Sequence, residues 1–174
     1  MSGPVGCASS ETRTNMDAVT RRKTLRMLSN GMYVMTSKSA EKYGGATVTW
    51  VSQASFRPPL IMAAVRKESS VFRCMSESGV AALHILGSDQ TDVARKFFTP
   101  TRADSCGLNG ESFTEGATSA PILRNAPAYL ECRVLRILDD LGDHAVVILE
   151  VLGAGCRREV EPLTIAASPW EYGG

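Results

Sequence analysis

The chain has 174 residues, of which 44% are hydrophobic and 21% charged. These fractions are close to globular averages, so they exclude a disordered, collagen-like or coiled-coil chain. The net charge of +1 gives no global attraction to nucleic acid or to an acidic membrane. The aromatic fraction of 6% argues against a base-stacking surface. We therefore expect one globular domain with no nucleic-acid partner and no membrane partner.

The N-terminus is polar, and residues 1–14 are predicted to form a flexible tail ahead of a folded domain at 15–174. No apolar run reaches transmembrane length, and the tail does not resemble a signal peptide. The five cysteines include no CxxC pair, and only two histidines are present, so no metal site is expected. Free thiols in a reducing compartment are the simplest interpretation, which predicts a cytoplasmic location.

The first part of the chain predicts a helix followed by a β-hairpin. The helix is expected over 15–29, where Thr14 and Asp17 fit a capping box. The hairpin is expected over 31–52, with strand-forming residues on both sides of a polar turn at 38–45 that ends in two glycines.

The remainder predicts further strands and two short helices. One helix is expected over 69–78 with Gly79 as its stop, and another over 89–98 with Asp89 as N-cap. Residues 101–126 have little periodicity and are predicted to be a long loop. Strands are expected at 60–65, 80–86, 128–138 and 145–152, with one more short strand after Pro162.

This order of elements predicts a mainly β fold. Six or more strands with few, short helices are typical of a β-barrel with helices at its edge. Because the helices do not alternate regularly with the strands, a doubly wound parallel sheet is not expected.

A basic, hydroxyl-rich segment stands where a strand ends and a helix begins. Arg66 and Lys67 carry two positive charges, and Ser69 and Ser70 place two hydroxyls at the helix start. A helix N-terminus offers free N–H groups and a partial positive charge, so this arrangement suits a phosphate. An ordinary capped helix beside solvated charges explains the same residues, and both interpretations stay open.

The sequence lacks the common nucleotide-binding and hydrolase motifs, and its two histidines have no clear catalytic setting. The sequence contains no GxGxxG, no GxxxxGK[ST] and no GxSxG, so Rossmann, P-loop and serine-hydrolase sites lack support. His84 lies inside an apolar run, where a buried structural histidine is expected. His144 follows Gly142 and Asp143 at a strand start, where a lone histidine is more often structural or exposed than functional.

The order of several segments resembles the flavin reductase-like family, which includes the small reductase components of two-component flavin monooxygenases. The matching segments are GATVTWVSQAS at 45–55, the Pro58-Pro59 break, the 66–70 segment and the Gly-Asp-His element at 142–144. The resemblance covers roughly residues 20–174.

The resemblance implies an FMN-binding split β-barrel of Greek-key type with a few short peripheral helices, paired as a homodimer. It implies FMN, with FAD as the less favoured flavin, and NADH or NADPH as substrate. It assigns nicotinamide-nucleotide binding to His144. The residues that it implies for flavin binding are Thr47, Val48, Thr49, Trp50, Val51, Ser52, Gln53, Ala54, Arg66, Lys67, Ser69, Ser70 and Phe97.

The expected function is therefore that of a reductase that transfers a hydride from NAD(P)H to FMN and supplies reduced flavin to a monooxygenase or redox partner. Because the flavin carries the chemistry, no catalytic side chain and no metal are expected. The alternative is an FMN-bound electron-transfer protein of the flavoredoxin kind that keeps its flavin. A β-barrel without flavin, used only for interactions, is a third interpretation.

Overall fold

The computed structural model describes residues 17–40 and 42–173, and the chain divides into two compact units. One unit holds the described residues up to Leu28 together with 172–173, and the other holds Ser29–Glu171. The predicted tail at 1–14, with Thr14 of the expected capping box, lies outside the described residues.

Helix α1 (Ala18–Leu25) belongs to the first unit and is shorter than the predicted 15–29. Asp17 is its N-cap, because the carboxylate accepts hydrogen bonds from the Thr20 N–H at 2.8 Å and from the Thr20 hydroxyl. The prediction that placed Asp17 inside the helix was therefore wrong. No side chain of α1 is buried. None of the described helices is long and apolar enough to cross a membrane.

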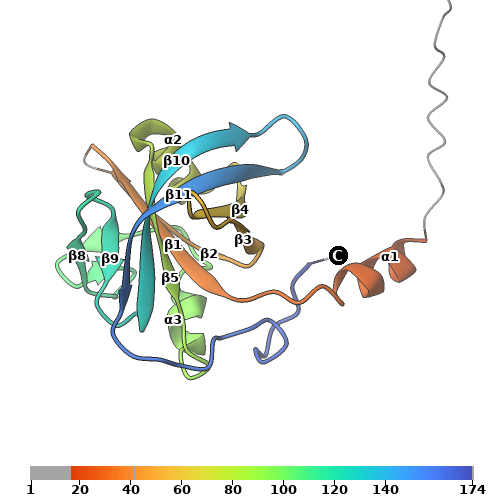
Figure 1. Ribbon diagram of the computed structural model, residues 1–174. Helices are drawn as coiled ribbons and strands as arrows, with labels where there is room; N and C mark the ends of the chain where they lie inside the picture. Colours follow the sequence, from red (N-terminus) through yellow and green to blue (C-terminus); the bar gives the residue numbers. More distant parts are fainter. Residues whose placement is uncertain (1–16, 41, 174) are drawn as a thin grey trace, which may run out of the picture. The chain divides into compact units, whose positions relative to one another are not determined.

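The second unit is built on a seven-stranded antiparallel sheet (Figure 1) with the order β2-β1-β5-β10-β11-β4-β3. The strands are β1 (Tyr33–Ser39), β2 (Lys42–Val48), β3 (Val51–Ser55), β4 (Leu60–Arg66), β5 (Val80–Ile85), β10 (Ala128–Leu138) and β11 (His144–Cys156). This confirms the prediction of a mainly β fold.

The sheet curls into a barrel that is split between its first and last strands. β2 and β3 lie at opposite edges of the sheet, yet only Thr49 and Trp50 connect them. Two connecting residues span at most about 11 Å between the flanking Cα atoms. The edges are therefore close at this point, which is the split barrel that the resemblance implied.

Helix α2 (Ser70–Ser78) has the ends that its sequence predicts. The Ser69 hydroxyl accepts from the Phe72 N–H at 3.2 Å, and Gly79 ends the helix in the left-handed region with φ 71°. Val71, Cys74 and Met75 have the helical spacing of one face, and this face is buried.

The hairpin over 31–52 is present, but its predicted turn was wrong. β1 and β2 pair from Tyr33–Val48 to Ser39–Lys42, so Gly44 and Gly45 lie within β2. A Cβ on Gly44 would stand 2.5 Å from the Val71 Cα of α2, and one on Gly45 would stand 2.9 Å from the Phe97 ring. These glycines therefore mark close packing rather than a turn. The predicted strand at 46–52 is divided between β2 and β3.

The predicted 101–126 loop contains four short strands that form two small sheets. They are β6 (Ala103–Asp104), β7 (Gly107–Leu108), β8 (Phe113–Glu115) and β9 (Pro121–Leu123). Leu108, Ile122 and Leu123 of this region are buried, so it is part of the core. Strands of two or three residues have too few positions for a periodicity to be detected.

Two smaller predictions also need correction. Helix α3 (Thr91–Lys96) has Gln90 as N-cap with no side-chain cap, while Asp89 pairs with Arg158 at 3.5 Å. In the described part of the chain, the segment after Pro162 contributes isolated bridges at Pro162 and Thr164 and no further strand.

The core has a main cluster inside the barrel and a second cluster under α3 and the 101–126 region. Strand β11 shows the pattern for the barrel, since Ala145, Val147 and Leu149 point inward and are fully buried. The second cluster includes Phe97, Leu108 and Leu123. It supports α3 against the outer edge of β2.

Candidate functional site

The N-terminus of α2 has the properties of an anion-binding position. The first-turn N–H group of Ser70 has no hydrogen-bond partner among the described residues and belongs to a partly exposed residue, whereas the next residue, Val71, is fully buried. The Ser69 hydroxyl has no proton left for a ligand, because it donates to the Arg66 carbonyl at 2.7 Å and accepts from the Phe72 N–H. Ser69 thus shapes the turn, and the accessible free donor is the backbone N–H of Ser70.

Thr101 joins this helix terminus to β2, and the sequence reasoning missed it. Its hydroxyl accepts from the Gly45 N–H at 2.8 Å and donates to the Gly45 carbonyl at 2.9 Å. The Ser70 hydroxyl lies 2.8 Å from the same oxygen. Since the Thr101 proton is used on Gly45, the Ser70 hydroxyl is the donor in this third contact. One hydroxyl therefore links the 66–70 segment to the strand that carries Thr47.

The side chains in the first half of the predicted flavin-binding stretch are held by α3 or buried in the protein. The Thr47 hydroxyl donates to the Ala94 carbonyl of α3 at 2.7 Å, and its N–H donates to the Phe97 carbonyl at 3.2 Å. The side chains of Val48 and Thr49 are buried. At these positions a ligand outside the barrel meets mainly backbone.

The second half of the stretch forms an open sheet edge. β3 pairs with β4 alone, and the side chains of Ser52, Gln53 and Ala54 are exposed. The Ala64 N–H donates to the Trp50 carbonyl at 2.9 Å. Hydrogen-bonded pairs alternate along an antiparallel ladder, so the N–H and C=O of Gln53 point away from β4. A flat ring can lie against this edge, because the neighbouring side chains are small.

The two predicted cations lie at the end of β4 but differ in their contacts. The Lys67 ammonium donates to the Asp139 carbonyl at 2.8 Å, and its N–H donates to the Asp143 carbonyl. Lys67 thus holds the turn between β10 and β11. Arg66 is exposed and lies directly opposite His144 in the pairing of β4 with β11.

His144 lies in a small cluster of polar and aromatic groups. Its Nδ1 lies 2.9 Å from the Asp143 carboxylate, and its ring centroid lies 4.8 Å from that of Trp50 at an interplanar angle of 54°. The hydrogen bond to His144 lowers the pKa of Asp143, with a smaller contribution from the charge of Arg66. His144 and Trp50, far apart in the sequence, are therefore neighbours.

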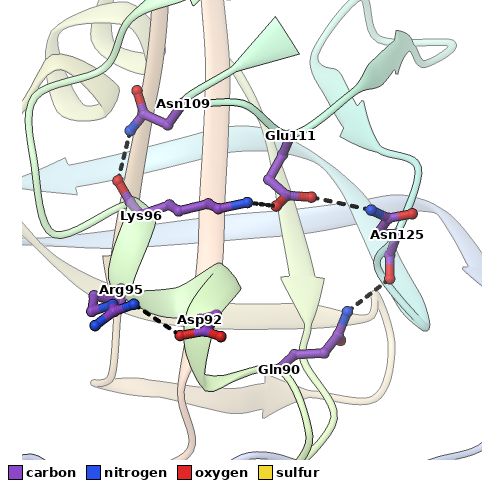
Figure 2. Close-up of polar contacts among 7 residues, drawn as sticks. All are labelled: Gln90, Asp92, Arg95, Lys96, Asn109, Glu111 and Asn125. Carbon is purple, nitrogen blue, oxygen red and sulfur yellow. Dashed lines mark hydrogen bonds and ion pairs between the residues drawn. The ribbon is translucent and has the colours of Figure 1, made fainter. Parts of the chain in front are cut away.

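Phe97 packs against β2, the strand that carries the first residues of the predicted flavin-binding stretch. Its side chain is 2% exposed and lies in the second core cluster, against Gly45. The helix before it is held by the Lys96–Glu111 ion pair, and Asn125 donates to the other oxygen of Glu111 (Figure 2). The Glu111 side chain is almost fully buried, so this network fixes α3 beside β2.

His84 is a buried structural histidine, as its apolar surroundings predicted. Its Nε2 accepts from the Leu123 N–H at 3.0 Å, so its Nδ1 carries the proton and donates to the Val34 carbonyl at 2.9 Å. Burial lowers the pKa of His84 to about 4. The residue is neutral near pH 7 and ties β5 to β1 and β9.

These positions fit a ligand that has both a phosphate group and a flat ring. The free Ser70 N–H at the start of α2 suits the phosphate, and the open edge of β3 suits the ring. Thr101 fixes this helix start to β2, which continues through Thr49 and Trp50 into β3. In the described residues, no group of three or more His, Cys, Asp or Glu side chains could hold a metal ion. The fold and this site define a split-barrel protein of the cofactor-binding kind.

Comparisons with known proteins identify the family. A model described as "Flavin reductase like domain" matches residues 25–169, so the chain belongs to the flavin reductase-like family. The chain is 33% identical over 146 residues to Diflavin flavoprotein A 1 of Synechocystis sp., covering 82% of this chain and 25% of that protein. It is 32% identical over 142 residues to FMN reductase (NADH) SmoA of Agrobacterium fabrum, covering 82% and 78% of the two chains.

A solved structure shows the same architecture. BorF, the flavin reductase component of a bacterial two-component tryptophan halogenase, superposes with a TM-score of 0.72 at 25% identity, covering 84% of this chain and 91% of BorF. The chain thus spans most of SmoA and BorF but only about a quarter of the diflavin flavoprotein.

Proposed function

We propose that this protein is an NAD(P)H-dependent flavin reductase that uses FMN. The observation that carries the proposal is the Thr101 contact, which holds the N-terminus of α2 against β2, the strand that leads through Thr49 and Trp50 into the open edge strand β3. SmoA, which this chain resembles over most of its length, is named an FMN reductase (NADH). This supports the same activity here.

In this proposal the side chains bind and orient, and none acts as an acid or base. When bound, the flavin supplies the acceptor for the hydride of the nicotinamide C4. The Ser70 N–H at the start of α2 binds the FMN phosphate, with Arg66 as the neighbouring cation. The outward N–H of Gln53 stands where it can donate to the ring edge, and His144 binds the nicotinamide nucleotide. Phe97 supports the site through its carbonyl rather than by touching the ring.

Anaerobic mixing with NADH or NADPH tests the activity. The purified protein, given one equivalent of FMN, is expected to bleach the visible absorbance of the flavin at a rate that saturates with rising concentration of one of the two nucleotides. A fluorescence titration that shows no saturable FMN binding would remove the proposal. Saturable FMN binding without bleaching of the flavin by either nucleotide would favour an FMN-bound electron-transfer protein instead.

A second candidate function is an FMN-bound electron-transfer protein. It is favoured by the match to a quarter of a protein that is named for two flavins. Steady-state oxidation of NAD(P)H with excess free FMN separates the two functions. A reductase turns over repeatedly, whereas a carrier that keeps its flavin does not.

We also propose a homodimer that delivers reduced flavin to a monooxygenase or another redox partner. Support comes from an apolar outer face on adjacent strands, formed by Met62 of β4, Ile148 of β11 and Leu138 of β10. Sedimentation of the wild type at micromolar concentration is expected to give a dimer, and Met62→Glu is expected to weaken it. A flavin-bound wild-type monomer would contradict the proposal. The cytoplasmic location stays a prediction.

A further inference from the structure

Trp50 reaches across a whole strand on the outer surface of the barrel. It precedes β3, while His144 begins β11, and β4 lies between these two strands. Strands in a sheet lie about 4.8 Å apart, and His144 also lies two residues along β11 from the position level with Trp50, so their backbones are separated by more than twice that distance. The ring centroids are nevertheless only 4.8 Å apart. The indole must therefore lie over β4, on the side that β4 turns away from the core.

The strand beneath the indole has a side chain that allows this position. Ala64 is the β4 residue bonded to the Trp50 backbone, and its methyl group leaves room for the ring. Arg66 stands two residues further along the same face, opposite His144. The indole thus has the His144 imidazole at one end, and the Trp50 residue is 37% exposed.

The direction of the indole separates it from the position assigned to the flavin. The ring points toward β11, so it does not cover the outward N–H and C=O groups of Gln53 at the free edge of β3. A hydride passes between rings whose reacting atoms lie about 3–3.5 Å apart, so the nicotinamide must border the flavin. Trp50 lies between the β3 edge and His144, which is where the second ring must enter.

We propose that Trp50 is a contact residue for the nicotinamide ring, which stacks on the exposed indole while His144 meets the polar parts of the dinucleotide. The inference rests on the proposed function. It assigns Trp50 to the binding of the nicotinamide nucleotide and not to the binding of the flavin. Aromatic stacking adds affinity through the ring face and tolerates either NADH or NADPH.

The test uses Trp50→Ala and Trp50→Phe, with Trp170→Phe as the matched control. Trp170 is the other of the two tryptophans and packs edge-on against Phe98 instead. Trp50→Ala is expected to raise the KM for NAD(P)H by about tenfold, with FMN affinity changed less than about twofold. Trp50→Phe keeps a smaller ring and is expected to fall between Trp50→Ala and the wild type.

A binding readout that needs no turnover accompanies the kinetics. In Trp170→Phe protein the fluorescence comes from Trp50, and NAD⁺ is expected to quench it saturably. In Trp50→Phe protein the fluorescence comes from Trp170, and no saturable quenching is expected. If Trp50→Ala fails to fold, the kinetics of Trp50→Phe and this titration still show whether Trp50 contacts the nicotinamide ring.

Two results would overturn the inference. One is a loss of FMN affinity with an unchanged KM, which would return Trp50 to the flavin. The other is an unchanged KM with no NAD⁺ quenching, which would make Trp50 a surface aromatic only. Both can occur in a protein that reduces flavin, so they leave the proposed function standing. A wild type without NAD(P)H-dependent flavin reduction would refute the proposed function, and the quenching titration would still test Trp50.

Discussion

Replacing Thr101 with valine removes the hydroxyl that connects α2 to β2 and keeps the shape of the side chain. The change deletes contacts of 2.8 and 2.9 Å to the N–H and C=O of Gly45 and one of 2.8 Å to Ser70. Gly45 is buried, and an unsatisfied buried polar group costs about 1–3 kcal/mol. Because Thr101 itself is partly exposed, water can replace part of the loss. We therefore expect the free energy of unfolding to fall by ~2–3 kcal/mol.

Thermal unfolding measures this loss directly. In a domain of this size each kcal/mol lowers Tm by about 2–4 °C, so Thr101→Val is expected to melt roughly 4–12 °C below the wild type. FMN affinity is expected to fall as well, since α2 is no longer held at β2. Thr101→Ser keeps the hydroxyl and should restore both values. Thr99→Val, which removes one exposed hydrogen bond to the Lys96 carbonyl, is the matched control. A Tm for Thr101→Val equal to that of Thr99→Val would refute the linking role.

Three further predictions concern the cation, the substrate histidine and the buried histidine. Arg66→Ala should weaken FMN about tenfold to a hundredfold and riboflavin much less, because riboflavin lacks the phosphate; equal losses would make Arg66 structural. His144→Ala should raise the KM for NAD(P)H by about tenfold with FMN affinity nearly unchanged, and a lowered Tm with unaltered kinetics would show a turn-stabilising role instead. His84 is held neutral by burial, with its pKa lowered from 6.5 to about 4. Between these pH values the unfolded chain binds a proton at His84 that the folded chain does not. The contribution of His84 to the free energy of unfolding is therefore fully present above pH 6.5 and falls by about 3 kcal/mol in total as the pH drops toward 4. Urea unfolding at several pH values measures this slope, which should be shallower in His84→Gln; an equal slope in both proteins would show that other groups cause it.

Features that depend on neighbouring residues could be predicted from the sequence alone. Helix α2 begins at Ser69 and ends at Gly79 because a hydroxyl cap and a left-handed glycine act within one turn of the chain. Strand β11 could be recognised because residues 145–149 form a continuous apolar run rich in strand-forming residues, after the turn at 139–143. The basic segment before α2 indicated an anion site from local charge and helix polarity. The family resemblance then gave this segment a role in a split barrel.

Tertiary structure decided the features in which distant residues meet. Gly44 looked like a turn residue, and only the approach of the α2 backbone shows why a Cβ is excluded there. Thr101 had no local signal, since its three contacts go to residues far from it in the sequence. The meeting of Trp50 with His144 depends on the order of strands β3, β4 and β11. Local patterns fix which conformation a segment prefers, whereas the partners of its polar groups and rings are set by which strands become neighbours when the sheet closes.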